Sequence, residues 1–408
     1  MDFSLEYTEE QEQFAKEVRE WLDDNVPKDL VSPRDPLKLS YEQWQKRREL
    51  GRKLGKKGWL YPGYPAEYGG GGLDAAHSSV LMQELAERHL GLPPYHDSGG
   101  VLGAPAILVC GTEEQKKRLL PPILTGRAAT WQLFTEPEAG TDEANQKTNA
   151  LRSVRDRDHF IVNGGKIFVG GIYPPPEQFL LLTRSDVEAP RHQNLAMFIC
   201  PANLPGITII PLDLFVPAVF AMISGPAVDS ADGVKYQVFF DDVSIHESYL
   251  IGGERDGWKV ASATLEVEHG GGTGRRVPRN VVVEKFLSQC RSNPNIVKRL
   301  RESPQLLDSV VDTYISAQIE RLFATRNASG VGAPYTGPQL SIYSKMFAGR
   351  LIADMAKVLG PCALTDDAHW GLDDDIFEVA QRGGVCFAPG GTPEALKIVM
   401  SRALAIGR

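Results

Sequence analysis

The sequence lacks the features that mark membrane-spanning, exported or disulfide-stapled proteins. Its most apolar stretch, residues 195–228, is interrupted by several prolines and by Asp213, so it cannot supply the roughly 20 unbroken apolar residues of a membrane-spanning helix. The N-terminal residues are acidic and no apolar run follows them, which argues against an export signal. The five cysteines are odd in number, far apart and without a CxxC pair. We therefore expect free thiols, a reducing compartment and a cytoplasmic location.

An excess of basic charge is also missing. The 44 Lys and Arg residues are outnumbered by 52 Asp and Glu residues, which gives a net charge of −8. Such a chain has no overall attraction to nucleic acid or to anionic membranes. The sequence contains no GxSxG, GxxxxGK[ST] or HExxH motif, and its eight histidines are scattered. Serine-hydrolase, P-loop and zinc chemistry are therefore not predicted, and we expect no metal, nucleic acid or membrane partner.

What the sequence does contain is enough apolar material for several domains, with 42% hydrophobic residues in 408. Two capping boxes, each a Thr followed three residues later by Gln, predict helices that begin after Thr8 and after Thr112. The first helix should end at Pro27 and the second at Pro121-Pro122. Residues 1–130 are therefore expected to form an N-terminal helical domain.

The next block, residues 131–245, changes to the alternating period of β-strands. Strands are predicted over 179–183, 195–200 and 234–240. Two further β-type runs flank Asn163-Gly164, a dipeptide favoured in tight turns, so a β-hairpin is predicted there. This block is expected to be a β domain.

From Trp258 onward the helical period returns. It is clearest over 306–323, 340–359 and 393–406, where Pro393 suits a first helical turn. The last domain is expected to be a helical bundle that spans residues 246–408.

A polar segment, Thr135–Asp142, lies at the boundary between the first two blocks. Thr135 and Thr141 flank a turn that contains Pro137 and Gly140, and such a turn offers hydroxyls and backbone N–H groups to a polar heterocycle or a phosphate. On its own, the segment fits a plain structural turn as well.

Several segments, in order along the chain, resemble the motifs of the acyl-CoA dehydrogenase family. They are Gly58–Pro62, Pro65–Gly70, Gly111–Gln115, Thr135–Asp142, Asn163–Phe168, Phe239–Val243, Gly252 with Asp256–Trp258, and Gly391–Glu394. The resemblance implies an α+β multidomain fold with an N-terminal α-helical domain, a middle β-barrel and a C-terminal four-helix bundle. The divergent form is similar to a bacterial branch that includes sterol side-chain and branched-chain acyl-CoA dehydrogenases.

The resemblance also implies a reaction, the FAD-dependent α,β-desaturation of an acyl-CoA thioester. A carboxylate removes the α-proton while the β-hydrogen leaves as hydride to flavin N5. Many members carry this base in a Tyr-Glu-Gly-Thr segment, where this chain has Gly390 in place of the glutamate. A second family location, Leu-x-x-Glu-Arg, matches Leu265–His269 and assigns the base to Glu268.

The helical period supports that assignment. At about 100° per residue, Glu268 falls on the stripe of Trp258, Ala261 and Leu265, whereas Glu266 points away. A carboxylate on this inner stripe would lose water and its pKa would rise, which suits a base that takes a proton from carbon. A surface or ion-paired glutamate is the alternative.

For the flavin, the resemblance implies that Thr135 and the backbone of Phe134 hold the pyrimidine ring. It places Thr141 at the phosphate or nearby CoA region and Phe168 against the isoalloxazine, although Phe168 also fits an alternating core position of its strand. It further assigns to the cofactor site Leu133, Gly140, Val169, Gly170, Thr392 and Glu394.

Two departures from the family keep other functions open. Gly170 stands where most members have a Thr that donates toward flavin N5, and residues 291–305 lack an Arg-x-x-Phe-Gly element that contacts the FAD of a neighbouring subunit. Arg299 or Arg301 would have to substitute for that arginine. The expected partners are an acyl-CoA substrate, an electron-transfer flavoprotein and further subunits in a homo- or hetero-oligomer, either a dimer or a tetramer. The alternatives are a non-catalytic or flavin-sharing subunit and a flavin oxidase.

Overall fold

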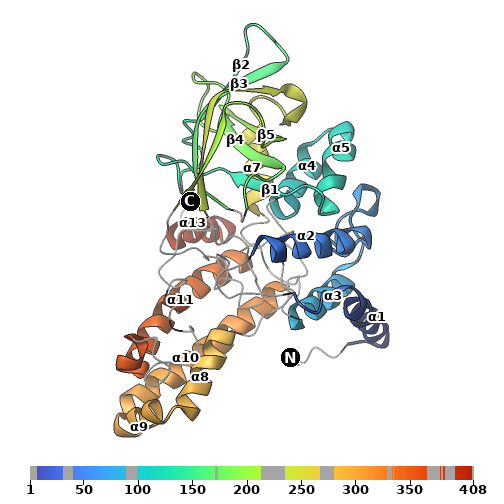
Figure 1. Ribbon diagram of the computed structural model, residues 1–408. Coiled ribbons are helices and arrows are strands. Elements are labelled where there is room, and N and C mark those ends of the chain that lie inside the picture. Colours follow the sequence, from blue (N-terminus) through green and yellow to red (C-terminus); the bar gives the residue numbers. More distant parts are fainter. Residues whose placement is uncertain are drawn as a thin grey trace. The chain divides into compact units, whose positions relative to one another are not determined.

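The computed structural model describes residues 7–30, 40–88, 99–170, 173–212, 235–266, 280–328, 333, 335–364, 377, 380–381 and 391–406. Helices precede and follow a central run of strands (Figure 1). Contacts divide the chain into two compact units, with the described residues up to 266 in the first and those from 280 onward in the second. The three-domain boundaries at residues 130 and 245 stay a prediction.

The opening helices are α1 (Glu9–Asn25), α2 (Tyr41–Lys56), α3 (Ala75–Glu87), α4 (Ala104–Cys110) and α5 (Glu113–Leu124), with the short turns η2 (Ala66–Tyr68) and η3 (Gly99–Gly103). Both predicted capping boxes are confirmed, because Thr8 and Thr112 each bond reciprocally with the Gln three residues on. The predicted stop at Pro121 is wrong, since α5 continues through both prolines to Leu124. Thr125 is the C-cap of the helix, and its N–H still donates to the carbonyl of Pro121 at 3.1 Å.

The strands are β1 (Thr130–Leu133), β2 (Asn149–Arg152), β3 (His159–Gly170), β4 (Gln178–Arg184), β5 (Leu195–Pro201), β6 (Ile207–Leu212), β7 (Lys235–His246) and β8 (Leu250–Ile251). They form one sheet in the order β6-β7-β3-β2-β4-β5-β8, and β1 pairs in parallel with β4. The predicted strands at 179–183 and 195–200 are confirmed as β4 and β5. The third predicted strand is confirmed from residue 235 onward as β7, and Val234 lies outside the described residues.

The predicted hairpin at Asn163-Gly164 is wrong, because β3 runs straight through this dipeptide. β7 has one extra residue opposite it, a β-bulge in which Asp242 takes a φ of 48°. The side chain of Asn163 fits this bulge: its amide donates to Asp242 Oδ1 at 2.9 Å, and its oxygen accepts from the Asp242 N–H at 2.9 Å. Long-range pairing has therefore overridden a local turn signal.

Gly164 itself cannot carry a side chain. Its φ is 140°, and a Cβ there would come within 2.6 Å of the Thr148 Cα. We expect Gly164→Ala to lower the free energy of unfolding by about 3 kcal/mol, from backbone strain and overpacking together. Urea denaturation checks this, with Gly140→Ala as the control, since a Cβ on Gly140 meets nothing within 4 Å. Equal losses of stability in both variants would contradict the conclusion that the backbone and the close neighbours of Gly164 require a glycine.

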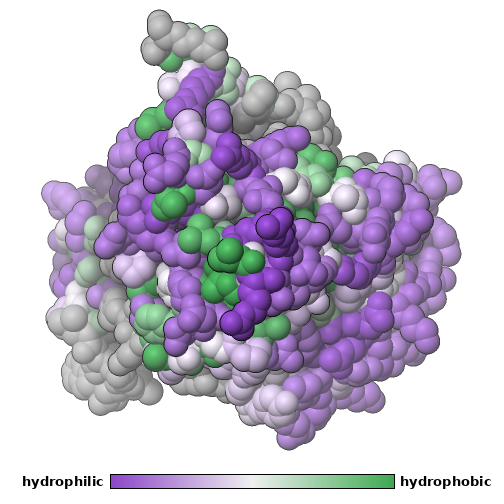
Figure 2. All heavy atoms as spheres, turned by 90° about the horizontal axis from the view of Figure 1, so that it is seen from above, coloured by the Kyte–Doolittle hydropathy of each residue, from purple (hydrophilic) through white to green (hydrophobic). Residues whose placement is uncertain are grey.

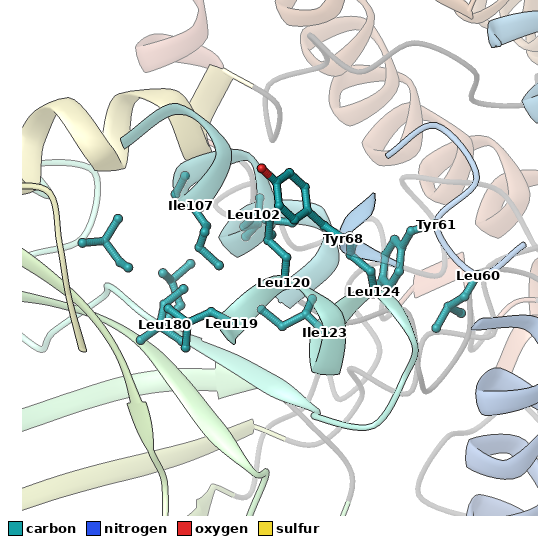
Figure 3. Packing of buried hydrophobic residues seen from close by; sticks show 14 of the residues in the cluster. Leu60, Tyr61, Tyr68, Leu102, Ile107, Leu119, Leu120, Ile123, Leu124 and Leu180 are labelled. Carbon is teal, nitrogen blue, oxygen red and sulfur yellow. The ribbon is translucent and has the colours of Figure 1, made fainter. Parts of the chain in front are cut away.

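The first unit has two apolar cores that share β4 and β5. Phe179 and Leu181 face one core, which consists mainly of side chains from the strands themselves. Leu180 and Leu182 face the other, where they pack with the opening helices. Figure 3 shows Leu180 beside Leu119 of α5. Because both faces are covered, β4 reads as an unbroken apolar run rather than as an alternating one.

A further helix, α7 (Gly257–Glu266), follows η5 (Glu247–Tyr249) and β8 and belongs to the first unit. Val260, Ala261 and Thr264 are fully buried, and the Thr264 hydroxyl contacts the carbonyl of Leu102 in η3 at 3.4 Å. The predicted inner stripe is therefore confirmed for Ala261, and Trp258 is half-buried against the same core.

Most of the described residues of the second unit are helical. They form α8 (Val281–Ser292), α9 (Pro294–Glu302), α10 (Pro304–Ala328), α11 (Thr336–Leu359), η7 (Gly360–Leu364) and α13 (Pro393–Ala403). Helices α10 and α11 pack side by side around a core that includes Phe286, Phe347 and Leu351. Among the described helices, none is long and apolar enough to cross a membrane. On the face shown in Figure 2, hydrophilic residues prevail and hydrophobic ones gather in small groups.

Candidate functional site

The Thr135–Asp142 segment forms a tight turn at the end of β1. Leu133 and Phe134 are buried and anchor its start, whereas Thr135 is half-buried and Gly140 and Thr141 are exposed. The turn is closed by two backbone hydrogen bonds between Glu136 and Ala139, at 2.9 and 3.1 Å. Its hydroxyl and backbone groups are thus held on an anchored loop where a ligand can reach them.

Phe168 lies on a second β-bulge, where β3 has one extra residue relative to β7 between Lys166 and Val169. Its φ is 58°, a left-handed conformation that is unusual for a bulky residue. The bulge turns the ring outward, so that 53% of Phe168 is exposed while the next residue, Val169, is buried in the sheet core. The alternative interpretation of Phe168 as an alternating core residue is therefore wrong.

The start of the Thr135–Asp142 turn and the bulged part of β3 are joined by hydrogen bonds. The N–H of Ile167 donates to the carbonyl of Thr135 at 2.9 Å. The Lys166 ammonium donates to the carbonyl of Phe134 at 3.1 Å. The structure thus brings together the predicted pyrimidine-binding residues and the predicted stacking aromatic, Phe168, which lie more than thirty residues apart in the sequence.

Two charged residues that sequence reasoning missed lie beneath this junction. Lys166 is fully buried on β3, and its Nζ is 2.7 Å from the carboxylate of Glu136, which is also buried. Burial lowers the pKa of Lys166 to about 8, although Glu136 opposes the shift. Burial alone would raise the pKa of Glu136, but the Lys166 charge and hydrogen bonds from Lys147 and Thr148 hold it below its usual value. The sequence offers one indication of this buried lysine, because Lys166 lies on the same side of its strand as Phe160 and Val162.

The depressed pKa of Glu136 gives a pH prediction. A carboxylate with a lowered folded-state pKa contributes stability that is complete above its unfolded value of 4.5 and is lost as the pH falls through the folded value. Glu136→Gln should therefore cost about 3 kcal/mol near neutral pH, and the difference from wild type should shrink below pH 4.5. Urea denaturation at pH 7, 5, 4 and 3 measures this. A difference that is constant over this range would contradict it.

The remaining predicted site residues are spread over the chain. Thr392 and Glu394 lie in the second unit, where the Thr392 hydroxyl caps α13 by accepting from the Ala395 N–H at 3.2 Å and Glu394 is exposed. Gly170 is half-buried at the end of β3. Glu268 and Gly390 lie outside the described residues, so their roles stay predictions.

Of the two arginines predicted to replace the missing family arginine, Arg299 is already engaged. Its guanidinium donates to the carbonyls of Val358 at 3.2 Å and Lys357 at 3.0 Å, at the C-terminal end of α11. Arginine at a helix C-terminus satisfies carbonyls that lack intrahelical partners. Arg301, which is exposed, is the one left for the predicted role.

Comparison with known proteins identifies the family of this chain. Residues 8–127 match the model of the acyl-CoA dehydrogenase N-terminal domain, and residues 132–217 match that of the middle domain. Acyl-CoA dehydrogenase IpdE1 of Mycobacterium tuberculosis is 30% identical over 78% of this chain and 75% of its own length. IpdE1 of Mycolicibacterium smegmatis is 27% identical over 77% of this chain and 78% of its own length.

Solved structures show the same fold. A structure described as the Tcur3481-Tcur3483 steroid ACAD superposes with a TM-score of 0.76 at 25% identity and covers 100% of both chains. The ChsE4-ChsE5 complex from Mycobacterium tuberculosis gives a TM-score of 0.73 at 23% identity, also over 100% of both chains. The predicted α+β multidomain fold is confirmed. The chain belongs to the acyl-CoA dehydrogenase family, whose members are flavin-dependent oxidoreductases.

Proposed function

We propose that this chain binds FAD and desaturates an acyl-CoA thioester at the α,β position, with Glu268 as the base. The observation that carries the proposal is the outward-facing Phe168 ring beside the accessible Thr135 loop, joined by the hydrogen bond from Ile167 to Thr135. An exposed aromatic next to backbone and hydroxyl groups fits a flat heterocycle with a polar edge. The bound flavin would supply the hydride acceptor.

The chain's own residues would perform the remaining tasks. The backbone of Phe134 and the hydroxyl of Thr135 would orient the pyrimidine edge, and Phe168 would cover the ring and exclude water. Thr141, exposed on the same turn, would meet the phosphate or CoA region. Glu268 would take the α-proton. Its assignment is supported by the inner stripe of α7, because the helical period carries the buried positions Ala261 and Thr264 on to residue 268.

The substrate is proposed to have a branched or bulky acyl group. Gly390 removes side-chain volume where other family members carry glutamate, whereas Gly391 has a backbone reason to be glycine, since its φ is 86°. The steroid ACAD described above, 25% identical, is similar to the whole chain. Turnover of straight-chain esters with none of branched or ring-bearing ones would contradict this part of the proposal.

One experiment tests the proposed reaction. The purified chain should show the visible absorption of a bound flavin, and anaerobic addition of a suitable acyl-CoA from a panel of straight, branched and ring-bearing esters should bleach it. Electrons should then pass to an electron-transfer flavoprotein. Peroxide release on turnover in air would instead identify a flavin oxidase.

A second candidate, a subunit that shares its flavin with a different chain, is favoured by one observation. Arg299, a predicted replacement for the missing family arginine, already caps α11. This candidate predicts a colourless purified chain and a yellow complex once its partner subunit is added.

An oligomer is proposed in either case, as a dimer or a tetramer. Helix α10 buries one face against the second-unit core, and its opposite face exposes Leu307, Val311, Tyr314, Ile315 and Leu322. A helix that is apolar on both faces is usually covered on both. Light scattering should give a mass of at least twice 44.8 kDa, and Val311→Glu/Ile315→Glu should lower it. Asp308→Asn, on the same helix, is the control. An unchanged mass in the double variant would contradict the proposal that this face of α10 forms the contact between subunits.

A further inference from the structure

A buried ammonium group joins the two segments that are proposed to bind the flavin. The Nζ of Lys166 donates to Glu136 at 2.7 Å, to the Phe134 carbonyl at 3.1 Å and to the amide oxygen of Gln146. An ammonium group has three donors, so each has a partner inside the protein. Lys166 and Glu136 are 0% and 4% exposed, and their charges are therefore almost fully removed from water.

Glu136 extends this network to a third segment. Its carboxylate accepts from the N–H groups of Lys147 at 2.6 Å and Thr148 at 3.0 Å. The Thr148 hydroxyl in turn donates to the Gly165 carbonyl at 3.2 Å and accepts from the Gly165 N–H at 3.1 Å. The end of β1, the segment before β2 and the bulged part of β3 are thus tied to a single ion pair.

Stability alone does not account for such a pair. Burying two charges costs several kcal/mol each, and replacing a buried ion pair by neutral groups of similar volume is often neutral or stabilising. The pair does account for the conformation of Phe168. A bulky residue at a φ of 58° costs of order 1–3 kcal/mol and persists only when its surroundings fix it. Lys166 on one side and the buried Val169 on the other fix this residue.

We infer that Lys166 and Glu136 are positioning residues, which set the spacing between the Phe134–Thr135 backbone and the Phe168 ring for the cofactor. The inference rests on the proposed function. Neither residue contacts the flavin in this account, because their polar atoms are engaged within the network. They act through the backbone of Phe134, through the Ile167–Thr135 hydrogen bond and through the bulge that carries Phe168.

The test is the double variant Glu136→Gln/Lys166→Met, which removes both charges and nearly keeps both volumes. The amide oxygen that the first substitution introduces can still accept a hydrogen bond from the N–H of Lys147 or Thr148. We expect an unchanged far-ultraviolet circular dichroism spectrum and a Kd for FAD at least tenfold higher, measured by fluorescence as the apoprotein is titrated with FAD. The visible circular dichroism of the bound flavin should also change.

The matched control is Glu113→Gln/Lys116→Met on α5. It removes a Lys–Glu pair of the same 2.7 Å length that lies on the surface, and it should keep the Kd for FAD within twofold of wild type. A Kd within twofold of wild type in the buried double variant would overturn the inference alone. A wild-type chain that binds no FAD would overturn the proposed function, and the inference with it.

A second variant decides the matter if the buried double variant does not fold. Thr148→Val keeps the shape of the side chain and removes only the hydroxyl that bonds Gly165. We expect it to raise the Kd for FAD three- to fivefold without loss of secondary structure. An unchanged Kd in this variant overturns the inference.

Discussion

Glu268→Gln should lower kcat by about 10²- to 10⁴-fold while the flavin stays bound, because glutamine has the shape of glutamate and cannot accept the α-proton. The loss should appear in kcat and in kcat/KM alike, since the interaction that is removed is made in the transition state. Stopped-flow measurement of flavin bleaching in a single turnover reports this step directly. The visible spectrum of the resting variant shows whether the cofactor is retained.

Glu266→Gln is the matched control for that result. It makes the same substitution two residues earlier, at a position that the helical period directs about 200° away from Glu268. It should keep kcat within about twofold of wild type. If Glu268→Gln retains full activity in a reconstituted complex, the base lies in another chain and this chain is a non-catalytic subunit. If both variants lose activity equally, the effect is not specific to the proposed base.

Local signals in the sequence predicted the parts of the fold that depend on neighbours along the chain. The capping box at Thr112 fixed the start of α5, because both of its hydrogen bonds join residues three positions apart. From residue 235 onward, the strand predicted over 234–240 is part of β7, where the alternate residues Tyr236, Val238 and Phe240 are buried. The end of α5 was not predicted: Pro121 and Pro122 each lack the N–H of an intrahelical hydrogen bond, yet the helix continues through both to Leu124.

Signals that compete with distant contacts failed for a physical reason. Asn163-Gly164 has turn chemistry, but its amide is satisfied by Asp242, 79 residues away, and no local pattern contains that partner. The same holds for the site. The motif around Thr135 and the ring of Phe168 were predicted by family resemblance. The Lys166–Glu136 pair that connects them could be seen only once the segment after β1 was found next to β3. The one indication in the sequence was that Lys166 lies on the inward-facing side of a strand.

Lys166→Met should be the most destabilising single substitution among those considered, at about 3–5 kcal/mol, because it leaves the Glu136 carboxylate buried without its counter-charge. Methionine nearly fills the volume of the lysine, so a cavity contributes little to this loss. Urea denaturation at pH 7 measures it as a lower midpoint at constant slope. Lys116→Met, which breaks the exposed pair with Glu113 on α5, should cost no more than about 1 kcal/mol.

The effects of replacing Lys166 and Glu136 on the free energy of unfolding should also be non-additive. Once Lys166 is replaced, a further change of Glu136 to Gln removes the uncompensated charge, so the double variant should recover most of the stability that Lys166→Met loses. This recovery separates the two roles of the pair, since it restores the fold without restoring the ion pair that spaces the Thr135 loop and Phe168. A single variant that loses less than 1 kcal/mol, or a double variant less stable than either single one, would show that the pair is not desolvated as its burial indicates.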